Sequence, residues 1–402
     1  MELNSLKDGD TPVLYGCVSK LKKVHKFAYV YLAIDDKIVE TLYKAEFCSV
    51  PFDNLCEGAF IKINATVKNQ PRSQYGKDIL ITDFSVLTKP YTDTPFPVYD
   101  KDLRVSLEDC MENKISAIRH MEIKKIYKAV SAIQRAFSDF FEDRGYTFIN
   151  TPVIVPMEND AFSLSYFNDT ASLITSAQPY LTPCTAAFGK VYSISHIFMN
   201  KRYNSTRHLN EYITLNAQSG YVNSINDIID LITDCIAYII TNLDKKKILK
   251  DIPLNYKKPQ IIEFYDALKI LGKENQTDLD PTDIKKLCAH FEDKSDFVIV
   301  THFPASTREF YIEENRDSTL NCFDLYFRGL KIGTGSKNIT DYNLAKNKNH
   351  NSDNIYTEAL TYGIMPFGGF TIGLERFCTK LLDLSNIREA SVFPRDVHHT
   401  MP

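Results

Sequence analysis

Residues 368–394, GGFTIGLERFCTKLLDLSNIREASVFP, are the most informative stretch of this 402-residue chain. The tetrapeptide Gly-Leu-Glu-Arg at 373–376 is weak evidence alone, because four residues recur by chance. Three further stretches precede it in order: RGYTFINTPVIVP at 144–156, GKVYSISHIFMNKRYNSTRHLNEYITLNAQ at 189–218 and CFDLYFRGLKIGTGS at 322–336. The four stretches have to be interpreted together.

Length, composition and charge limit the kinds of protein that this chain can be. A chain of 402 residues exceeds one hydrophobic core, so two or three domains are expected. Apolar residues make up 44% and charged residues 24%, which is ordinary for a folded soluble protein and argues against disorder. The formal net charge of -4 excludes a bulk basic surface, so any RNA contact must be a local patch.

The N-terminal residues contain no apolar run long enough for a signal peptide or a membrane span. The nine cysteines never form a CxxC pair, and no histidine stands at a metal-ligand spacing beside the closest two. Reduced, buried thiols are the ordinary interpretation. We therefore expect a cytoplasmic protein that does not associate with a membrane.

Residues 11–88 alternate short β-rich runs with turns, which predicts a small closed β-barrel of the OB type. The five runs are 13–18, 27–32, 37–43, 59–67 and 78–84. We assign residues 1–90 to this barrel. Three prolines between residues 89 and 97 indicate an extended chain, and residues 91–118 are expected to form a linker.

The remaining residues, 119–402, mix predicted strands and helices without a regular βαβ alternation. This pattern favours an α+β domain with an antiparallel sheet flanked by helices. Apolar residues at helical spacing predict one helix over 123–142 and a second over 223–243.

The four stretches, taken in order behind a barrel, resemble the class II aminoacyl-tRNA synthetases of the aspartate/asparagine branch. The resemblance implies a catalytic core over 119–402, a barrel that reads anticodons, and a homodimer formed through 144–156. It also implies ATP and Mg²⁺. In that family the carboxylate of an amino acid attacks the α-phosphate in line, so positioning and charge supply most of the rate.

The nucleotide half of the family's site is retained. By resemblance, Arg376 and Tyr212 sandwich the adenine, and the pair Arg207 and His208 lies near the β- and γ-phosphates. Two alternatives stay open from the residues themselves: Arg376 could pair with a local carboxylate, and Tyr212 could simply pack in the core.

The reactive half departs from the family. The family's Phe-Arg-x-Glu reads Phe198-Met199-Asn200-Lys201 here, so a thioether replaces the arginine that holds the α-phosphate. Lys201 reverses the charge of the glutamate. We expect Lys201 and Lys331 to be the candidate catalytic residues of an altered reaction.

The metal site also departs from the family, again through a lysine in place of a carboxylate. Asp324 matches the family's first metal carboxylate, whereas the second, seven residues on, is Lys331. A lysine beside Asp324 disfavours Mg²⁺ and would pair with that aspartate. Lys331 could also stand in for a cation against a phosphate.

The substrate pocket is altered too. Gln178 matches a substrate-binding glutamine, and Ser336 a serine of the family's Gly-Gly-Ser-x-Arg, where Asn338 replaces the arginine that grips the substrate. In the barrel, Tyr29, Ala33 and Glu40 align with the aromatic, arginine and glutamine that read the anticodon. Only the aromatic residue remains, so standard anticodon readout is not expected.

Three hypotheses follow. The first is a repurposed ATP-dependent ligase that activates a carboxylate and delivers it to an unusual acceptor, which the new lysines favour. The second is a non-catalytic synthetase-like binding or regulatory protein, which the lost arginine favours. The third is a working asparagine- or aspartate-tRNA ligase with unusual residues.

Overall fold

The computed structural model describes residues 5–25, 27–35, 37–73, 76–100, 102–249, 252–273, 275–350 and 354–400. These residues divide into two compact units between Lys125 and Ile126. Within this described part, none of the helices is long and apolar enough to cross a membrane.

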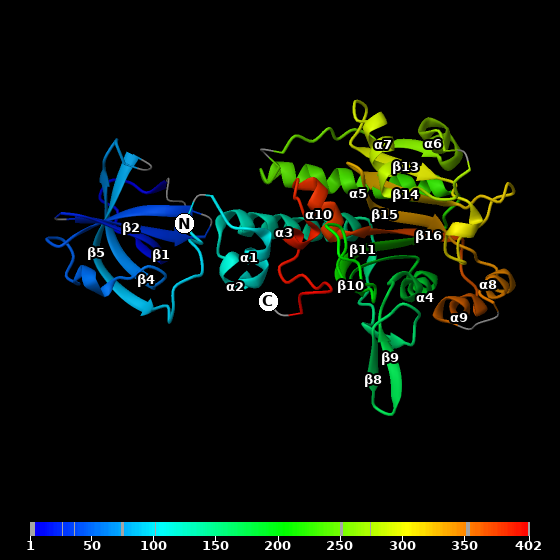
Figure 1. Ribbon diagram of the computed structural model, residues 1–402, viewed down its shortest axis with the longest axis horizontal. Coiled ribbons are helices and arrows are strands. Elements are labelled where there is room, and N and C mark those ends of the chain that lie inside the picture. Colours follow the sequence, from blue (N-terminus) through cyan, green and yellow to red (C-terminus); the bar gives the residue numbers. More distant parts are fainter. Residues whose placement is uncertain are drawn as a thin grey trace. The chain divides into compact units, whose positions relative to one another are not determined.

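The first unit contains a closed barrel of five strands in the order β1-β2-β3-β5-β4 (Figure 1). The strands are β1 (Val13–Val24), β2 (Phe27–Ile34), β3 (Lys37–Lys44), β4 (Phe60–Asn69) and β5 (Lys77–Thr88). Every second residue points inward, and Val30, Leu32 and Ile63 are fully buried in the barrel interior. The predicted barrel is therefore confirmed.

The first unit also contains short helices. They are η2 (Phe52–Asn54), within the barrel sequence, and α1 (Leu107–Glu112) and α2 (Lys114–Ala117), within the segment 91–118. Ser106 caps α1 by accepting a hydrogen bond from the backbone N–H of Asp109. Phe96, Val98 and Ala117 form a small apolar cluster that packs this segment.

The second unit is built on an eight-stranded sheet in the order β12-β13-β14-β15-β16-β11-β10-β6. Neighbouring strands of this sheet are antiparallel, except for the parallel pairs β12–β13 and β10–β6 at its two edges. The strands are β6 (Thr147–Phe148), β10 (Lys190–Phe198), β11 (Glu211–Gly220), β12 (Gln260–Glu263), β13 (Phe297–Thr301), β14 (Cys322–Phe327), β15 (Leu330–Lys337) and β16 (Phe367–Gly373). This antiparallel sheet with helices confirms the predicted α+β class.

One face of this sheet is covered by α3 (Met121–Glu142), α5 (Ile225–Lys245) and α10 (Leu374–Leu381). The apolar faces of α3 and α5 are buried, and both predicted helices are confirmed. Inward residues of the strands, such as Phe370 and Ile372 on β16, fill the same core. Since strand residues alternate between faces, Thr371 and Gly373 point to the opposite face.

The other elements surround that opposite face or extend the sheet. They are β7 (Ile154–Pro156), β8 (Ser163–Tyr166), β9 (Asp169–Leu173), α4 (Gln178–Phe188), α6 (Phe264–Leu271), α7 (Pro281–His290), η4 (Ala305–Thr307), α8 (Tyr342–Lys348), α9 (Ile355–Thr361) and η5 (Ile387–Ala390). Strands β7, β9 and β8 form a separate small sheet, whose β8–β9 hairpin projects from the unit in Figure 1.

Two glycines allow the central strands to approach closely. A Cβ on Gly369 would lie 2.3 Å from the carbonyl oxygen of Ala217 on β11, and one on Gly368 would lie 2.6 Å from that of Ser336 on β15. Any side chain at either position would push β16 away from a neighbour. This close approach explains the glycine pair at the start of the 368–394 stretch.

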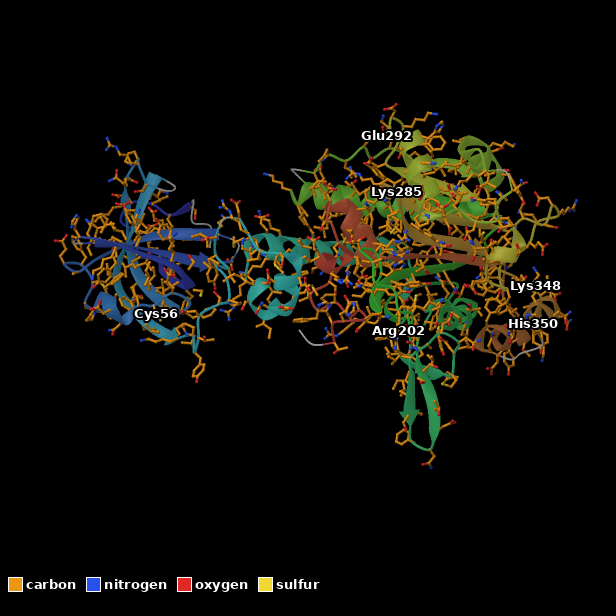
Figure 2. All side chains as sticks on the ribbon, in the orientation of Figure 1. Cys56, Arg202, Lys285, Glu292, Lys348 and His350 are labelled. Carbon is orange, nitrogen blue, oxygen red and sulfur yellow. The ribbon has the colours of Figure 1, made fainter. Side chains whose placement is uncertain are left out.

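All nine cysteines are free thiols, and most are buried. Cys56, on the surface of the barrel unit in Figure 2, is half-buried. Burial raises the pKa of thiols such as Cys235 and Cys378 well above its ordinary value, which keeps them protonated.

Candidate active site

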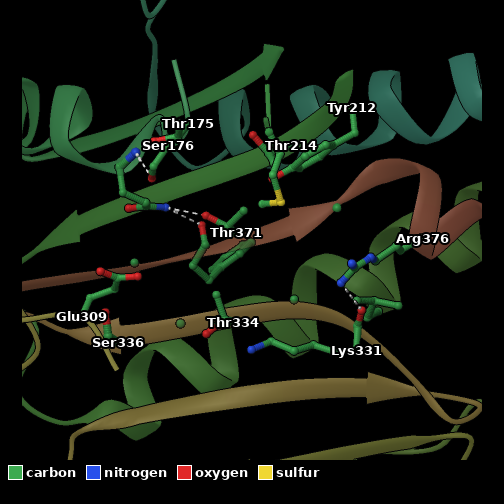
Figure 3. Close-up of a pocket in the computed structure, with 18 of the residues that line it drawn as sticks. Thr175, Ser176, Tyr212, Thr214, Glu309, Lys331, Thr334, Ser336, Thr371 and Arg376 are labelled. Carbon is green, nitrogen blue, oxygen red and sulfur yellow. Dashed lines mark hydrogen bonds between the residues drawn. The ribbon is translucent and has the colours of Figure 1, made fainter. Parts of the chain in front are cut away.

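A cavity of about 460 Å³ lies over the face of the sheet opposite α3 and α5 (Figure 3). Strands β11, β15 and β16 form its floor, and α10 and the loop before β11 supply its basic side chains. Its lining includes every nucleotide-binding residue that the sequence predicts: Arg207, His208, Tyr212 and Arg376.

Arg376 stands in the first turn of α10, where strand β16 runs into that helix. Its Nε donates to the carbonyl oxygen of Arg207 at 3.3 Å, and Nη1 donates to that of Lys331 at 3.4 Å. In the described part of the chain it forms no ion pair with a carboxylate. Burial and the nearby Arg207 lower the pKa of Arg376 from its ordinary value. An anion bound in the cavity would therefore stabilise the charged guanidinium.

Tyr212 is the second residue of β11 and faces the cavity opposite Arg376 in Figure 3. Its ring also packs against an apolar cluster that includes Val155, Ile174 and Ile197. The tyrosine therefore lines the cavity and packs at the edge of a core at once. Arg376 and Tyr212 thus line the same cavity.

Arg207 and His208 lie on the loop between β10 and β11. The Nδ1 of His208 is 2.7 Å from the hydroxyl of Ser205, and the ring of Tyr203 packs beside the imidazole at 4.6 Å. Burial, with the positive charges of Arg376 and Arg207, lowers the pKa of His208 to about 4. The imidazole is therefore neutral near pH 7, and the charge of this side of the cavity comes from the arginines.

Lys331 lines the cavity from β15, and its Nζ lies 2.7 Å from Oδ1 of the buried Asp324 on β14. The pairing expected from the sequence is present. The other oxygen of Asp324 accepts from Nη2 of Arg308 at 2.9 Å. Arg308 was not predicted from the sequence. A signal was available, because the eleven residues 297–307 contain no Lys, Arg, Asp or Glu and Arg308 directly follows them.

The two candidate catalytic lysines do not lie together. Lys201 pairs with Asp160 at 3.1 Å, and neither it nor the exposed Arg202 is among the described residues that line the cavity. Met199, which replaces the family's arginine in the sequence, does line the cavity. Lys331 is thus the new lysine placed to act on a bound ligand.

The amide of Gln178, at the start of α4, is already engaged. Its Nε2 donates to Oγ1 of Thr371 at 2.8 Å, and its Oε1 accepts from Nε2 of Gln218 at 2.6 Å. Ser336 lines the cavity and donates to Oδ1 of Asn338 at 2.7 Å. Asn338 is buried and is not among the described residues that line the cavity. It is therefore not placed to bind a ligand in the way expected of the family's arginine.

Glu375, next to Arg376, is a lining residue that had no role in the sequence-based prediction. Both of its carboxylate oxygens accept the backbone N–H of Ile213, at 3.1 and 3.0 Å, which ties α10 to β11. Burial raises the pKa of Glu375 to about 7. Its role is to hold the two elements that carry Arg376 and Tyr212.

The barrel, the antiparallel sheet and this basic cavity define a class II aminoacyl-tRNA synthetase architecture. Residues 106–397 match the family described as tRNA synthetases class II (D, K and N). The chain is 30% identical over 369 residues to the aspartate--tRNA(Asp) ligase of Pyrococcus abyssi, covering 85% of this chain and 84% of that one. It is 27% identical to the Thermoplasma volcanium aspartate--tRNA(Asp) ligase, covering 100% and 98%.

A solved structure shares the fold. The asparaginyl-tRNA synthetase of Pyrococcus horikoshii, complexed with asparaginyl-adenylate, superposes with a TM-score of 0.88 at 22% identity, covering 98% of this chain and 97% of that one. The chain belongs to the class II tRNA synthetases, in their aspartate/asparagine branch, as the sequence resemblance predicted. Within that family its sequence is diverged at residues 198–201 and in the substrate pocket.

The depressed pKa of His208 reports on the charge of the cavity. An inorganic triphosphate bound beside Arg207 and Arg376 should raise that pKa from about 4 toward its ordinary value, because the anion offsets both guanidinium groups. Histidine-selective NMR titrations with and without triphosphate measure this, and His208→Gln assigns the signal. A free-protein pKa near 6.5 would contradict the geometry.

Proposed function

We propose that this chain is an ATP-dependent ligase that binds the nucleotide in the cavity of Figure 3 and activates a carboxylate as its adenylate. The observation that supports this most is the joint placement of Arg376, Arg207, Tyr212 and Lys331 around one cavity. A carboxylate oxygen attacks the α-phosphorus, the bond to the β-phosphate oxygen breaks, and pyrophosphate leaves.

The carboxylate and the acceptor differ from those of the relatives in this proposal. Asn338 is buried where the family has its substrate-gripping arginine, and Gln178 already uses its amide within the protein. We infer a small carboxylate, with an amino acid as the first candidate, that is delivered to an acceptor other than the standard one. Residues 119–402 would form the catalytic domain, joined by 91–118 to the barrel of residues 1–90, in the cytoplasm.

Two other functions have specific support. Met199 removes the cation at the α-phosphate, which favours a nucleotide-binding protein without catalysis. The curated relatives, which are named as aspartate--tRNA ligases and match over most of their length, favour aspartate-tRNA ligation.

One set of measurements separates these functions. Pyrophosphate exchange with each of the twenty amino acids, together with calorimetry of ATP binding, should show binding and exchange with a restricted set of carboxylates. Arg376→Ala should abolish ATP binding, because its guanidinium forms one wall of the adenine site; Arg316→Ala, outside the cavity lining, is the control. Binding without any exchange would leave the non-catalytic function, and aspartate-specific exchange with tRNA charging would leave the translational one.

We also propose a homodimer. Strand β6 is an edge of the large sheet, and the adjacent segment exposes large apolar side chains, an arrangement that natural proteins normally cover. These side chains are Phe148, Val153, Ile154 and Met157. A second copy would cover this surface through the 144–156 stretch, as the family resemblance implies.

Sedimentation velocity should give a dimer mass at micromolar concentration. Ile154→Glu should shift the protein to monomer, because a buried unpaired carboxylate opposes association. Ile261→Glu is the matched control, since Ile261 is 49% exposed against 47% for Ile154 and lies on β12, the opposite edge. A monomeric wild-type protein would refute the dimer.

For the barrel we propose binding of single-stranded RNA without the family's anticodon readout. Phe27, Tyr29 and Tyr31 follow one another on the outer face of β2, with ring centroids 5.4 and 6.4 Å apart. Lys20 and Lys22 on β1 stand directly opposite Tyr31 and Tyr29. Aromatic rings flanked by lysines suit stacked bases and their phosphates.

A gel shift with transfer RNA transcripts at low salt tests the barrel. Tyr29→Ala should weaken binding by roughly 1–3 kcal/mol through the loss of one stacked base. Tyr15→Ala, an exposed tyrosine elsewhere on the barrel, should leave binding unchanged. Equal losses in both variants, or no shift in the wild-type protein, would reject this RNA surface.

A further inference from the structure

The position of Lys331 leads to an inference that rests on the proposed nucleotide site and extends it. Asp324 is 2% exposed, and its two oxygens are taken by different cations: Oδ1 by Lys331 at 2.7 Å and Oδ2 by Arg308 at 2.9 Å. The hydroxyl of Tyr326 also donates to Oδ2 at 3.2 Å. A carboxylate held in this way serves as an internal counter-ion.

The charges around Asp324 are consistent with that role. Burial alone would raise the pKa of Asp324, but Lys331 and Arg308 hold it below its ordinary value. The guanidinium of Arg308 is itself pinned, with Phe303 packed under it at 3.9 Å and Asp278 at 3.3 Å from Nη2. Arg308 therefore stays on Asp324. Both cations line the cavity, but Lys331 is the more exposed, at 36% against 13% for Arg308.

These residues do not fit the Mg²⁺ ion that the family implies. Mg²⁺ requires oxygen ligands in near-octahedral geometry, whereas Asp324 is saturated by cations and the second carboxylate position is occupied by the Lys331 ammonium. A divalent ion there would have to displace both cations and face their repulsion. In the described part of the chain, no cluster of three acidic, histidine or cysteine side chains could hold a metal.

The Lys331 ammonium is placed to contact a ligand. Its side chain is 36% exposed and extends along the cavity floor toward Thr334 in Figure 3. Its Nζ lies 2.7 Å from Oδ1 of Asp324, and its backbone carbonyl accepts from Nη1 of Arg376 at 3.4 Å. A ligand clamped by Arg376 at one end thus meets Lys331 further along the same floor.

We propose that Lys331, oriented by Asp324, replaces the divalent cation at this position and binds the phosphate chain of the nucleotide directly. The protein carries its own cation here, fixed by the sequence, so nucleotide binding does not depend on Mg²⁺ at this site. An ammonium is a compact point charge with rotatable donors, which suits a phosphate oxygen.

Calorimetric titration with ATP, in excess EDTA and in excess MgCl₂, tests this directly, with adenosine as the phosphate-free probe. In the wild-type protein the two ATP affinities should agree within about threefold. Lys331→Met should lose about tenfold in ATP affinity under both conditions, the size of one charged hydrogen bond, while adenosine binding is unchanged. Lys331→Glu should bind ATP only when Mg²⁺ is present, because it restores a pair of carboxylates.

Lys258→Met is the matched control, because Lys258 forms an exposed ion pair with Asp230 outside the cavity and should have no effect. Wild-type ATP affinity that falls more than threefold in EDTA would overturn this inference and leave the proposed function standing. ATP affinity unchanged in Lys331→Met would do the same. If neither ATP nor adenosine binds the wild-type protein, both the inference and the proposed function fail.

Discussion

The close packing of β16 between β15 and β11 is the constraint on which the rest of the catalytic unit depends. Gly368 and Gly369 let three backbones approach to distances that no side chain would tolerate. Once those strands are in register, their alternate residues separate into two sets. Phe370 and Ile372 enter the core under α3 and α5, and Thr371 and Gly373 face the cavity. Strand β16 then leads directly into α10 and places Arg376.

By the family resemblance, the cavity keeps the residues proposed to recognise a nucleotide and changes those expected to direct the reaction. Arg376, Arg207 and Tyr212 line one cavity, which is the nucleotide site in our proposal. Met199 and Lys331 both alter the charge beside that space, in opposite directions: one removes a cation and the other adds one. Decay alone would not be expected to add a cation that a buried aspartate holds in place. This pattern is the physical reason for preferring altered chemistry.

Conservation of fold and change of site are separable here because they depend on different residues. The sheet is held by apolar side chains on one face and by the glycine contacts, none of which involves the substituted positions. The substituted residues lie on the other face or in loops, outside this apolar core. A similar fold at 22% identity to a solved asparaginyl-tRNA synthetase is therefore compatible with a different substrate.

The sequence by itself determined the barrel, the antiparallel α+β core and the two long helices, because strand and helix periodicity are local signals. It also singled out Arg207, His208, Tyr212 and Arg376, which the structure brings to one cavity. It also determined the pairing of Lys331 with Asp324, since seven residues across a hairpin bring them together. Only the tertiary structure decided that Arg308 holds the other oxygen of Asp324, that Lys201 lies apart from Lys331, and that Asn338 is buried behind Ser336. Those outcomes depend on loops and on strands distant in the chain, whose side chains meet only after the sheet has formed.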